Sequence, residues 1–169
     1  MKQNSENMAL LSNDSSKYGE HFKEHLLAQY LKYIDMADKI SERRILTNSF
    51  FITVNTGLIS ALGIFDLFDK ATPIPIIIFS AIATGLLCVY WAKLIKSYSN
   101  LNTAKFEVIH EFEKYLPMRP FDFEWDRVGR GVNKKLYYPF SHIEKKIPYV
   151  FLLLYFLIFG FYLINKLSV

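Results

Sequence analysis

The amino-acid sequence predicts an all-α integral membrane protein with three transmembrane helices. Of its 169 residues, 51% are hydrophobic and 21% are charged. The apolar residues are concentrated in three blocks, residues 45–65, 73–92 and 147–164, and none of these blocks contains Asp, Glu, Lys or Arg. Each block has about the 20 residues that a helix needs to cross a bilayer. The third block also lacks the polar stripe that a buried helix of a soluble protein would show.

The first half of the chain predicts a helical hairpin. Residues 1–19 are polar and are expected to form a disordered cytoplasmic tail. Residues 20–44 predict a cytoplasmic helix that continues into the first span, residues 45–66, because one helical face carries Leu27, Tyr30, Ile34, Ala37 and Ser41. A short external loop, residues 67–72, then leads to the second span, residues 73–95, so the two spans must be antiparallel neighbours.

The second span is expected to continue as a cytoplasmic helical extension over residues 96–117. Its register runs through Leu94, Leu101, Lys105 and Phe112 until Pro117 ends the helix. The two extensions would bury their apolar faces against each other and form a cytoplasmic helical collar. An aromatic, irregular cytoplasmic or juxtamembrane segment follows at 118–146, then the third span at 147–165 and an external C-terminus at 166–169.

Basic residues predict the orientation in the membrane. Lysines and arginines flank the same ends of all three spans: Lys39, Arg43, Arg44, Lys93, Lys96, Lys145 and Lys146. Because basic flanks stay on the cytoplasmic side, we expect a cytoplasmic N-terminus and a periplasmic C-terminus. The net charge of +4 is then a property of the membrane flanks. Membrane lipids are the expected contact, and no nucleic-acid partner is expected.

Two short motifs resemble metal sites without completing one. His21-x-x-Glu24-His25 has the spacing of an inverted zinc protease motif, and Glu107-x-x-His110 resembles half of a di-iron site. The first would need a third ligand from a large further domain, and the second would need another such pair and two more glutamates. The only cysteine, Cys88, lies within the second span and is expected to serve packing. We therefore predict a non-enzyme with no catalytic residues, metal or cofactor.

Polar residues within the first two spans are candidates for oligomer contact or pore lining. Small residues recur along one face of the first span, two asparagines lie beside them, and the second span has a similar row: Asn48, Ser49, Thr53, Asn55, Thr56, Ser60, Ser80 and Thr84. Such residues let helices approach closely and hydrogen-bond across the contact, which is the favoured interpretation. The alternative is a water-lined pore in an oligomer.

The segment before the third span carries candidates for cytoplasmic recognition or lipid contact. These are aromatic, basic and titratable residues: Trp125, Arg127, Arg130, Lys134, Lys135, His142 and Glu144. Basic residues at this position contact anionic headgroups, each contributing about 1 kcal/mol. The alternatives are recognition of a ligand or protein partner, or a pH response through His142, which titrates near neutral pH when unperturbed.

Three runs of the chain resemble a known family. They are YIDMADKISERRILTNSFFITVNTGL, WAKLIKSYSNLNTAKFEVIHEFEKYLP and, further on, EWDRVGRG with YYPFSHIEKKIP. Together they resemble the bacterial RipA family of octameric membrane proteins over about residues 28 to 165. The resemblance implies a homo-oligomer of the bacterial inner membrane, with eight subunits. The layout of two spans with helical extensions is also similar to the SLATT effectors of bacterial conflict systems.

The predicted function is that of a non-enzymatic homo-octameric inner-membrane protein, acting as a scaffold or as a regulated pore. The alternative is a sensor or binding module in which residues 118–146 recognise a ligand, a pH change or a protein partner, in stress adaptation or antiphage defence.

Overall fold

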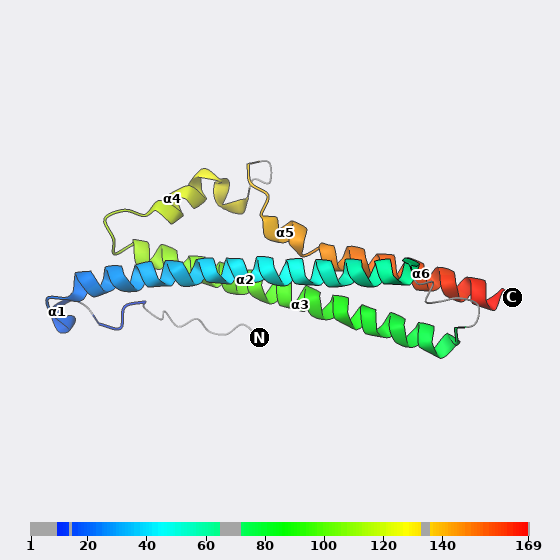
Figure 1. Ribbon diagram of the computed structural model, residues 1–169. Coiled ribbons are helices and arrows are strands. Elements are labelled where there is room, and N and C mark those ends of the chain that lie inside the picture. The colour runs from blue at the N-terminus through cyan, green and yellow to red at the C-terminus, as the bar shows by residue number, and fades with distance from the viewer. Residues whose placement is uncertain (1–9, 14, 65–71, 133–135, 169) are drawn as a thin grey trace, which may run out of the picture. The chain divides into compact units, whose positions relative to one another are not determined.

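A computed structural model describes residues 10–13, 15–64, 72–132 and 136–168, and within these ranges the chain is helical or irregular without strands. Figure 1 shows the elements in chain order: α1 Ser15–Tyr18, α2 Phe22–Ile64, α3 Ile74–Glu113, α4 Pro120–Arg127, the 3₁₀ helix η1 Gly129–Gly131, α5 Phe140–Glu144 and α6 Ile147–Leu167. Helices α2, α3 and α6 are each long and apolar enough to cross a membrane. The all-α prediction with three spans is confirmed, and the protein is a multi-pass membrane protein.

Prolines determine where most helices begin. Pro75 lies in the first turn of α3, Pro120 begins α4, and Pro148 lies in the first turn of α6. The missing N–H of proline costs nothing in a first turn, where the helix has no partner for it. Pro139 directly precedes α5. Since α2 contains no proline, its helix continues unbroken for 43 residues.

The chain divides into two compact units, and α2 and α3 contribute to both. Unit 1 comprises the residues up to Ser41 together with Leu101–Tyr138. Unit 2 comprises Glu42–Asn100 together with Pro139–Val169. Each unit has its own apolar core, and each is therefore described by itself.

In unit 1, α2 and α3 pack along a core that contains Leu26, Tyr30, Ala37, Ile109 and Phe112. Tyr30 and Ala37 lie on the predicted contact face, but Leu27 and Leu101 are exposed, and Leu26 and Ile109 are buried in their place.

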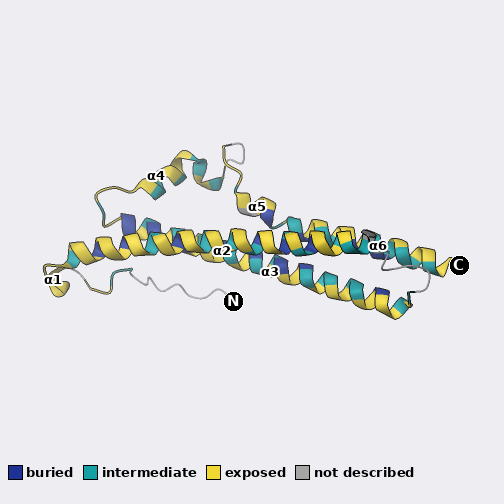
Figure 2. Cartoon of the chain, in the orientation of Figure 1, coloured by how far each residue is buried: buried dark blue, intermediate teal, exposed yellow. Residues whose placement is uncertain are grey.

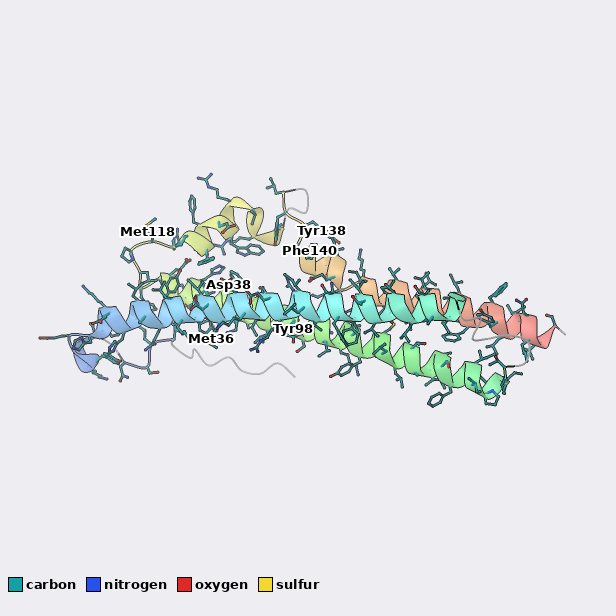
Figure 3. The ribbon with its side chains drawn as sticks, in the orientation of Figure 1. Met36, Asp38, Tyr98, Met118, Tyr138 and Phe140 are labelled. Carbon is teal, nitrogen blue, oxygen red and sulfur yellow. The ribbon has the colours of Figure 1, made fainter. Side chains whose placement is uncertain are left out.

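A lysine also takes part in this contact. Lys105 is buried, with its Nζ 4.4 Å from the centroid of the Tyr33 ring. A cation over an aromatic face is attracted by the ring quadrupole, which lets a charged residue occupy this contact. Figure 3 labels Met36 and Asp38 on the same stretch of α2, where both are exposed.

In unit 2, the three membrane-spanning helices pack around two small cores. One contains Phe51, Trp91 and Ile95, with the rings of Phe51 and Trp91 stacked at 5.5 Å. The other contains Ile77, Cys88, Tyr155 and Phe159. About half of the α6 residues are exposed on the chain, coloured yellow in Figure 2, and this fits a helix that faces lipid along one side.

The element bounds differ in detail from the sequence-based expectations. Ser15–Tyr18 forms a short helix within the segment expected to be a disordered tail. The helical extension of α3 ends at Glu113 rather than Pro117. Residues 65–71, which contain most of the expected external loop, lie outside the described residues, as do residues 1–9 of the tail.

Candidate functional site

The polar residues of the first span divide into a buried and an exposed set. Asn48 and Asn55 are buried within the chain, and Asn55 is 0% exposed. The other set is exposed and recurs on one face of α2: Ser49, Thr53, Thr56 and Ser60. The two asparagines therefore serve contacts within the chain, and the four small residues remain as candidates for oligomer contact or pore lining.

Asn55 is the centre of a polar cluster inside the three-helix packing. Its Nδ2 donates to the Phe51 carbonyl at 2.8 Å, and its Oδ1 accepts from Cys88 Sγ at 3.6 Å. The Tyr155 hydroxyl donates to the Asn55 carbonyl at 3.3 Å. Two turns before Asn55, Trp91 Nε1 donates to Asn48 Oδ1 at 3.2 Å. These bonds fix the register of α2 against α3 and α6, because an unpaired polar group in lipid is costly.

The polar residues of the second span form hydrogen bonds within their own helix. The Thr84 hydroxyl donates to the Ser80 carbonyl at 2.9 Å and lies 3.2 Å from the Ala81 carbonyl. Both Ser80 and Thr84 are half-buried. A hydroxyl that bonds its own helix backbone is satisfied without water. This pair is therefore a weaker candidate for a wetted surface than the exposed residues of α2.

In unit 1, a single carboxylate holds the start of α4. Glu113, at the end of α3, is 2% exposed. Its Oε1 accepts from the Phe121 N–H and its Oε2 accepts from the Asp122 N–H, both at 2.9 Å. The Tyr30 hydroxyl donates to Oε1 at 3.2 Å. Because the first N–H groups of a helix lack intrahelical partners and carry positive partial charge, Glu113 acts as an N-cap supplied by another helix.

The turn after α4 is closed by Arg130. This residue has a left-handed backbone at φ 47°, between Gly129 and Gly131, which also have positive φ. Its guanidinium pairs with Asp126 and with Asp122. The hydrogen bond to Asp126 raises the pKa of Arg130 most, and the hydrogen bond to Asp122 raises it further. The bond from Arg130 in turn lowers the pKa of Asp122. Arg130 is thus neutralised within the chain and is a poor candidate for binding a phosphate.

The remaining recognition candidates of unit 1 lie around the same turn. The Trp125 ring packs edge-on against Tyr137 at 6.0 Å and lies 3.3 Å from where a side chain on Gly131 would begin. Gly131 is therefore required here both by its positive φ and by the close approach of the Trp125 ring. Arg127 lies over the Phe123 ring at 4.8 Å. Lys134 and Lys135 lie outside the described residues.

His142 and Glu144 belong to unit 2 and differ from each other in exposure. His142 is exposed on α5, whereas Glu144 is 1% exposed. Glu144 Oε2 lies 3.2 Å from Arg44 Nε, close enough for an ion pair but not aligned for a hydrogen bond. Arg44 directly precedes the first apolar block, so this pair ties α5 to the polar end of the span. The two carboxylates that organise their surroundings, Glu113 and Glu144, are thus both buried.

The histidine motif at the start of α2 does not assemble a metal site. His21 Nδ1 lies 3.2 Å from Glu24 Oε2, and His25 Nδ1 lies 2.9 Å from the Tyr18 hydroxyl oxygen. Both histidines are exposed, with their rings stacked at 5.7 Å. Among the described residues, no three His, Cys, Asp or Glu side chains come together in a way that could hold a metal ion.

The Tyr30–Glu113 contact predicts a pH dependence of stability. Burial, then the charge of Glu113 and the hydrogen bond to it, raise the pKa of Tyr30 from 10.0 to about 12. At high pH the folded chain therefore keeps a proton on Tyr30 that the unfolded chain releases. The stabilising contribution of Tyr30 is complete below its pKa in the unfolded chain, and it is lost as the pH rises through its pKa in the folded chain. We expect the stability advantage of the wild type over Tyr30→Phe to narrow between about pH 9 and pH 12. Detergent-phase unfolding at several pH values measures this, and a constant difference would contradict it.

Sequence reasoning did not identify Glu113, Arg44 or Trp91 as organising residues. The only signal for Glu113 was its place just before Pro117 and Pro120, where a helix ends and another begins. A carboxylate there is a candidate cap, but nothing in the sequence shows that it reaches the next helix.

Comparison with known proteins gives one family. A model of the Octameric membrane protein family (8xMP) matches residues 27–164. No curated protein and no solved structure matches the chain.

Proposed function

The chain belongs to the octameric membrane protein family (8xMP), and from this premise we propose that it forms a homo-octamer in a bacterial inner membrane. It acts there, without catalysing a reaction, as a scaffold around a regulated central pore. The basic flanks of its spans orient the N-terminus and residues 93–146 toward the cytoplasm and the C-terminus toward the periplasm.

The observation that carries the proposal is the exposed polar face of α2. Ser49, Thr53, Thr56 and Ser60 lie within a membrane-spanning stretch, yet all four are exposed on the part of the chain that the structure describes. Small hydroxyl residues gain nothing from contact with lipid, but they favour close helix contacts and can hydrogen-bond to water. In an octamer, this face belongs where neighbouring subunits meet around the central axis.

Geometry favours a pore that needs a separate gate. Eight helices in a ring, spaced about 9.5 Å apart, leave a central opening roughly 14 Å wide. Such an opening is too wide to select ions by itself, so either lipid fills it or another part of the protein constricts it. The parts of α2 and α3 that form unit 1 supply the constriction, which makes conduction conditional.

Thiol labelling tests the wetted face. In a Cys88→Ser background, we expect Ser49→Cys, Thr53→Cys, Thr56→Cys and Ser60→Cys to react with a membrane-impermeant thiol reagent. Only a thiolate in water reacts rapidly. The buried position Asn48→Cys and the exposed position Phe156→Cys on α6 serve as controls that should remain unlabelled.

Vesicle flux tests the activity itself. Purified octamer in liposomes is expected to release a small entrapped solute, and the rate should fall when the reagent has modified the four positions. An octamer that neither conducts nor reacts at any of these positions would exclude the pore function and leave only the scaffold function.

A second candidate function is a cytoplasmic sensor, favoured by the ordered start of α4. Glu113 holds this helix in place, while Met118 and Phe123 remain exposed beside it; Figure 3 labels Met118. Apolar side chains on a well-ordered polar segment form a surface that a protein partner can bind. Substitution of Glu113 distinguishes the sensor from the pore. If the protein is a sensor, the substitution should abolish its response to the partner while vesicle flux remains unchanged.

A further inference from the structure

One face of α3 in unit 2 carries bulky apolar side chains that remain exposed on the chain. Phe79, Leu86 and Tyr90 are 73%, 64% and 59% exposed. Their spacing of seven and four residues places them on one helical face, and Lys93 and Ser97 continue it. This row therefore carries a cation, Lys93, at the polar end of the span.

A groove lies between α2 and α6 of the same unit. It has a volume of about 480 Å³ and is almost entirely apolar, lined by Ile59, Leu62, Leu157, Ile158, Phe161 and Tyr162. Phe161 on its rim is itself exposed. The groove can accept a bulky apolar side chain from outside the chain.

Contacts inside unit 2 show which positions lie at the same depth in the membrane. Cys88 on α3 bonds to Asn55 on α2, and Trp91 bonds to Asn48, so the two helices run antiparallel with a known register. Phe79 lies as far before Cys88 as Ile64 lies after Asn55. With 1.5 Å of rise per residue, Phe79 is within about one helical turn of the depth of Leu62 in the groove.

Charges at the polar end of the spanning parts of α2 and α3 are complementary. Glu42 is exposed on α2, on the face that carries Ser49, Thr53, Thr56 and Ser60. Lys93 and Lys96 are exposed on α3. Within the part of the chain that the structure describes, no ion pair is recorded for any of these three residues. By the same register Lys96 is level with Thr47, a little over one turn from Glu42, which long side chains can span.

The depth match extends from one chain to its neighbours. All copies carry the same basic flanks and insert in the same orientation, so the subunits of a ring are related by rotation about the membrane normal. Such a rotation changes no depth. A residue of α3 in one copy is therefore level in the neighbouring copy with the same α2 residues as in its own chain.

We propose that the exposed face of α3 in one subunit docks on the α2–α6 groove of the next. Phe79 enters the groove, and Lys93 and Lys96 face Glu42 of the second copy. This inference rests on the homo-oligomer of the proposed function and adds its contact surfaces. Because two different faces meet, the contact is head-to-tail, the kind that forms a ring when the rotation between subunits closes.

The charges favour a second copy over lipid as the occupant. Acyl chains can fill the groove, but they offer nothing to Glu42, and the anionic headgroups at that depth repel its carboxylate. The exposed face of α6, with Leu153, Phe156 and Leu157, has no charge within the bilayer and is the surface left for lipid.

Cysteine cross-linking tests the docking of Phe79. In the full chain with Cys88→Ser, the pair Phe79→Cys and Phe161→Cys should cross-link under mild oxidation into a ladder that extends beyond two copies to eight. The matched control, Phe79→Cys with Phe156→Cys, uses an equally exposed α6 position outside the groove and should give no ladder. An intact octamer without cross-links, with lipid retained in the groove, would overturn the proposal, as would products that stop at two copies.

Charge reversal tests the other end of the contact. Glu42→Lys, or Lys93→Glu with Lys96→Glu, should each remove most of the octamer in detergent, and combining all three should restore it. Lys146→Glu reverses an exposed charge outside the contact and should leave the octamer intact. Failure of the combination to restore the octamer, when each chain keeps its helical content, would contradict the pairing.

The outcomes also separate this inference from the proposed function. A cross-linked ladder from an octamer that does not conduct would support the proposed interface and contradict the proposed pore. A conducting octamer that gives no cross-linked ladder would contradict only the proposed interface.

Discussion

Replacing Glu144 by Ala is expected to lower the free energy of unfolding by about 3 kcal/mol, because it leaves Arg44 largely buried without its counter-charge. Glu144 is 1% exposed and its carboxylate lies 3.2 Å from Arg44 Nε. Breaking a buried pair costs more than the pair contributes, since the remaining charge stays out of water. The loss can be measured by reversible unfolding of the full chain in mixed detergent micelles.

The matched control removes both charges. Arg44→Leu combined with Glu144→Leu should recover most of the stability, because an apolar pair of similar volume needs no water. Glu124→Ala, which removes an exposed carboxylate, should change the stability by less than about 0.5 kcal/mol. If the double variant were as unstable as Glu144→Ala, packing of α5 rather than charge would explain the effect.

Replacing Glu113 by Ala is expected to release the start of α4 from α3. The substitution removes the acceptor of the Phe121 and Asp122 N–H groups and of the Tyr30 hydroxyl. Leaving partly buried donors without a partner costs about 1–3 kcal/mol each, so each of these two amides should exchange its hydrogen about 5- to 150-fold faster. Hydrogen exchange resolved to this segment measures the change directly, and trypsin cleavage after Arg127, the last residue of α4, provides an independent measurement.

Two controls distinguish the cap from general packing. Glu113→Gln keeps one carbonyl acceptor without the charge, and it should give an intermediate exchange rate because charged acceptors bond more strongly. Glu111→Ala removes an exposed carboxylate that pairs with Lys114 on the same helix end, so it should leave the exchange at Phe121 unchanged. Equal rates in Glu113→Ala and the wild type would show that α4 is held by its aromatic contacts alone.

The spans were predictable from the sequence because lipid imposes a simple requirement. A helix that crosses a bilayer must satisfy its own backbone and must be apolar over about 20 residues, and three uncharged blocks meet that condition. The unbroken α2 followed from the absence of proline between Phe22 and Ile64. The family was also within reach, because the runs that carry the resemblance lie within the matched residues 27–164.

The roles of individual polar residues were less predictable. Asn48 and Ser49 are adjacent in sequence and are both candidates for oligomer contact or pore lining from the sequence, yet one is buried and the other exposed. One residue turns a helix by about 100°, so which neighbour faces the core depends on where α3 and α6 pack. The same reason explains why Leu26 rather than Leu27 is buried in unit 1.

The sequence by itself thus determined the number of spans, their continuity into polar helices and the family, because hydrophobicity and helix propensity act locally along the chain. Only the tertiary structure decided that Asn55 bonds within the chain, that Glu113 caps α4 and that Arg44 pairs with Glu144. Each of these contacts joins residues that are distant in sequence, so it exists only once helix packing has brought them together. The exposed hydroxyl face of α2 became a candidate surface for the same reason, because only packing shows what remains uncovered.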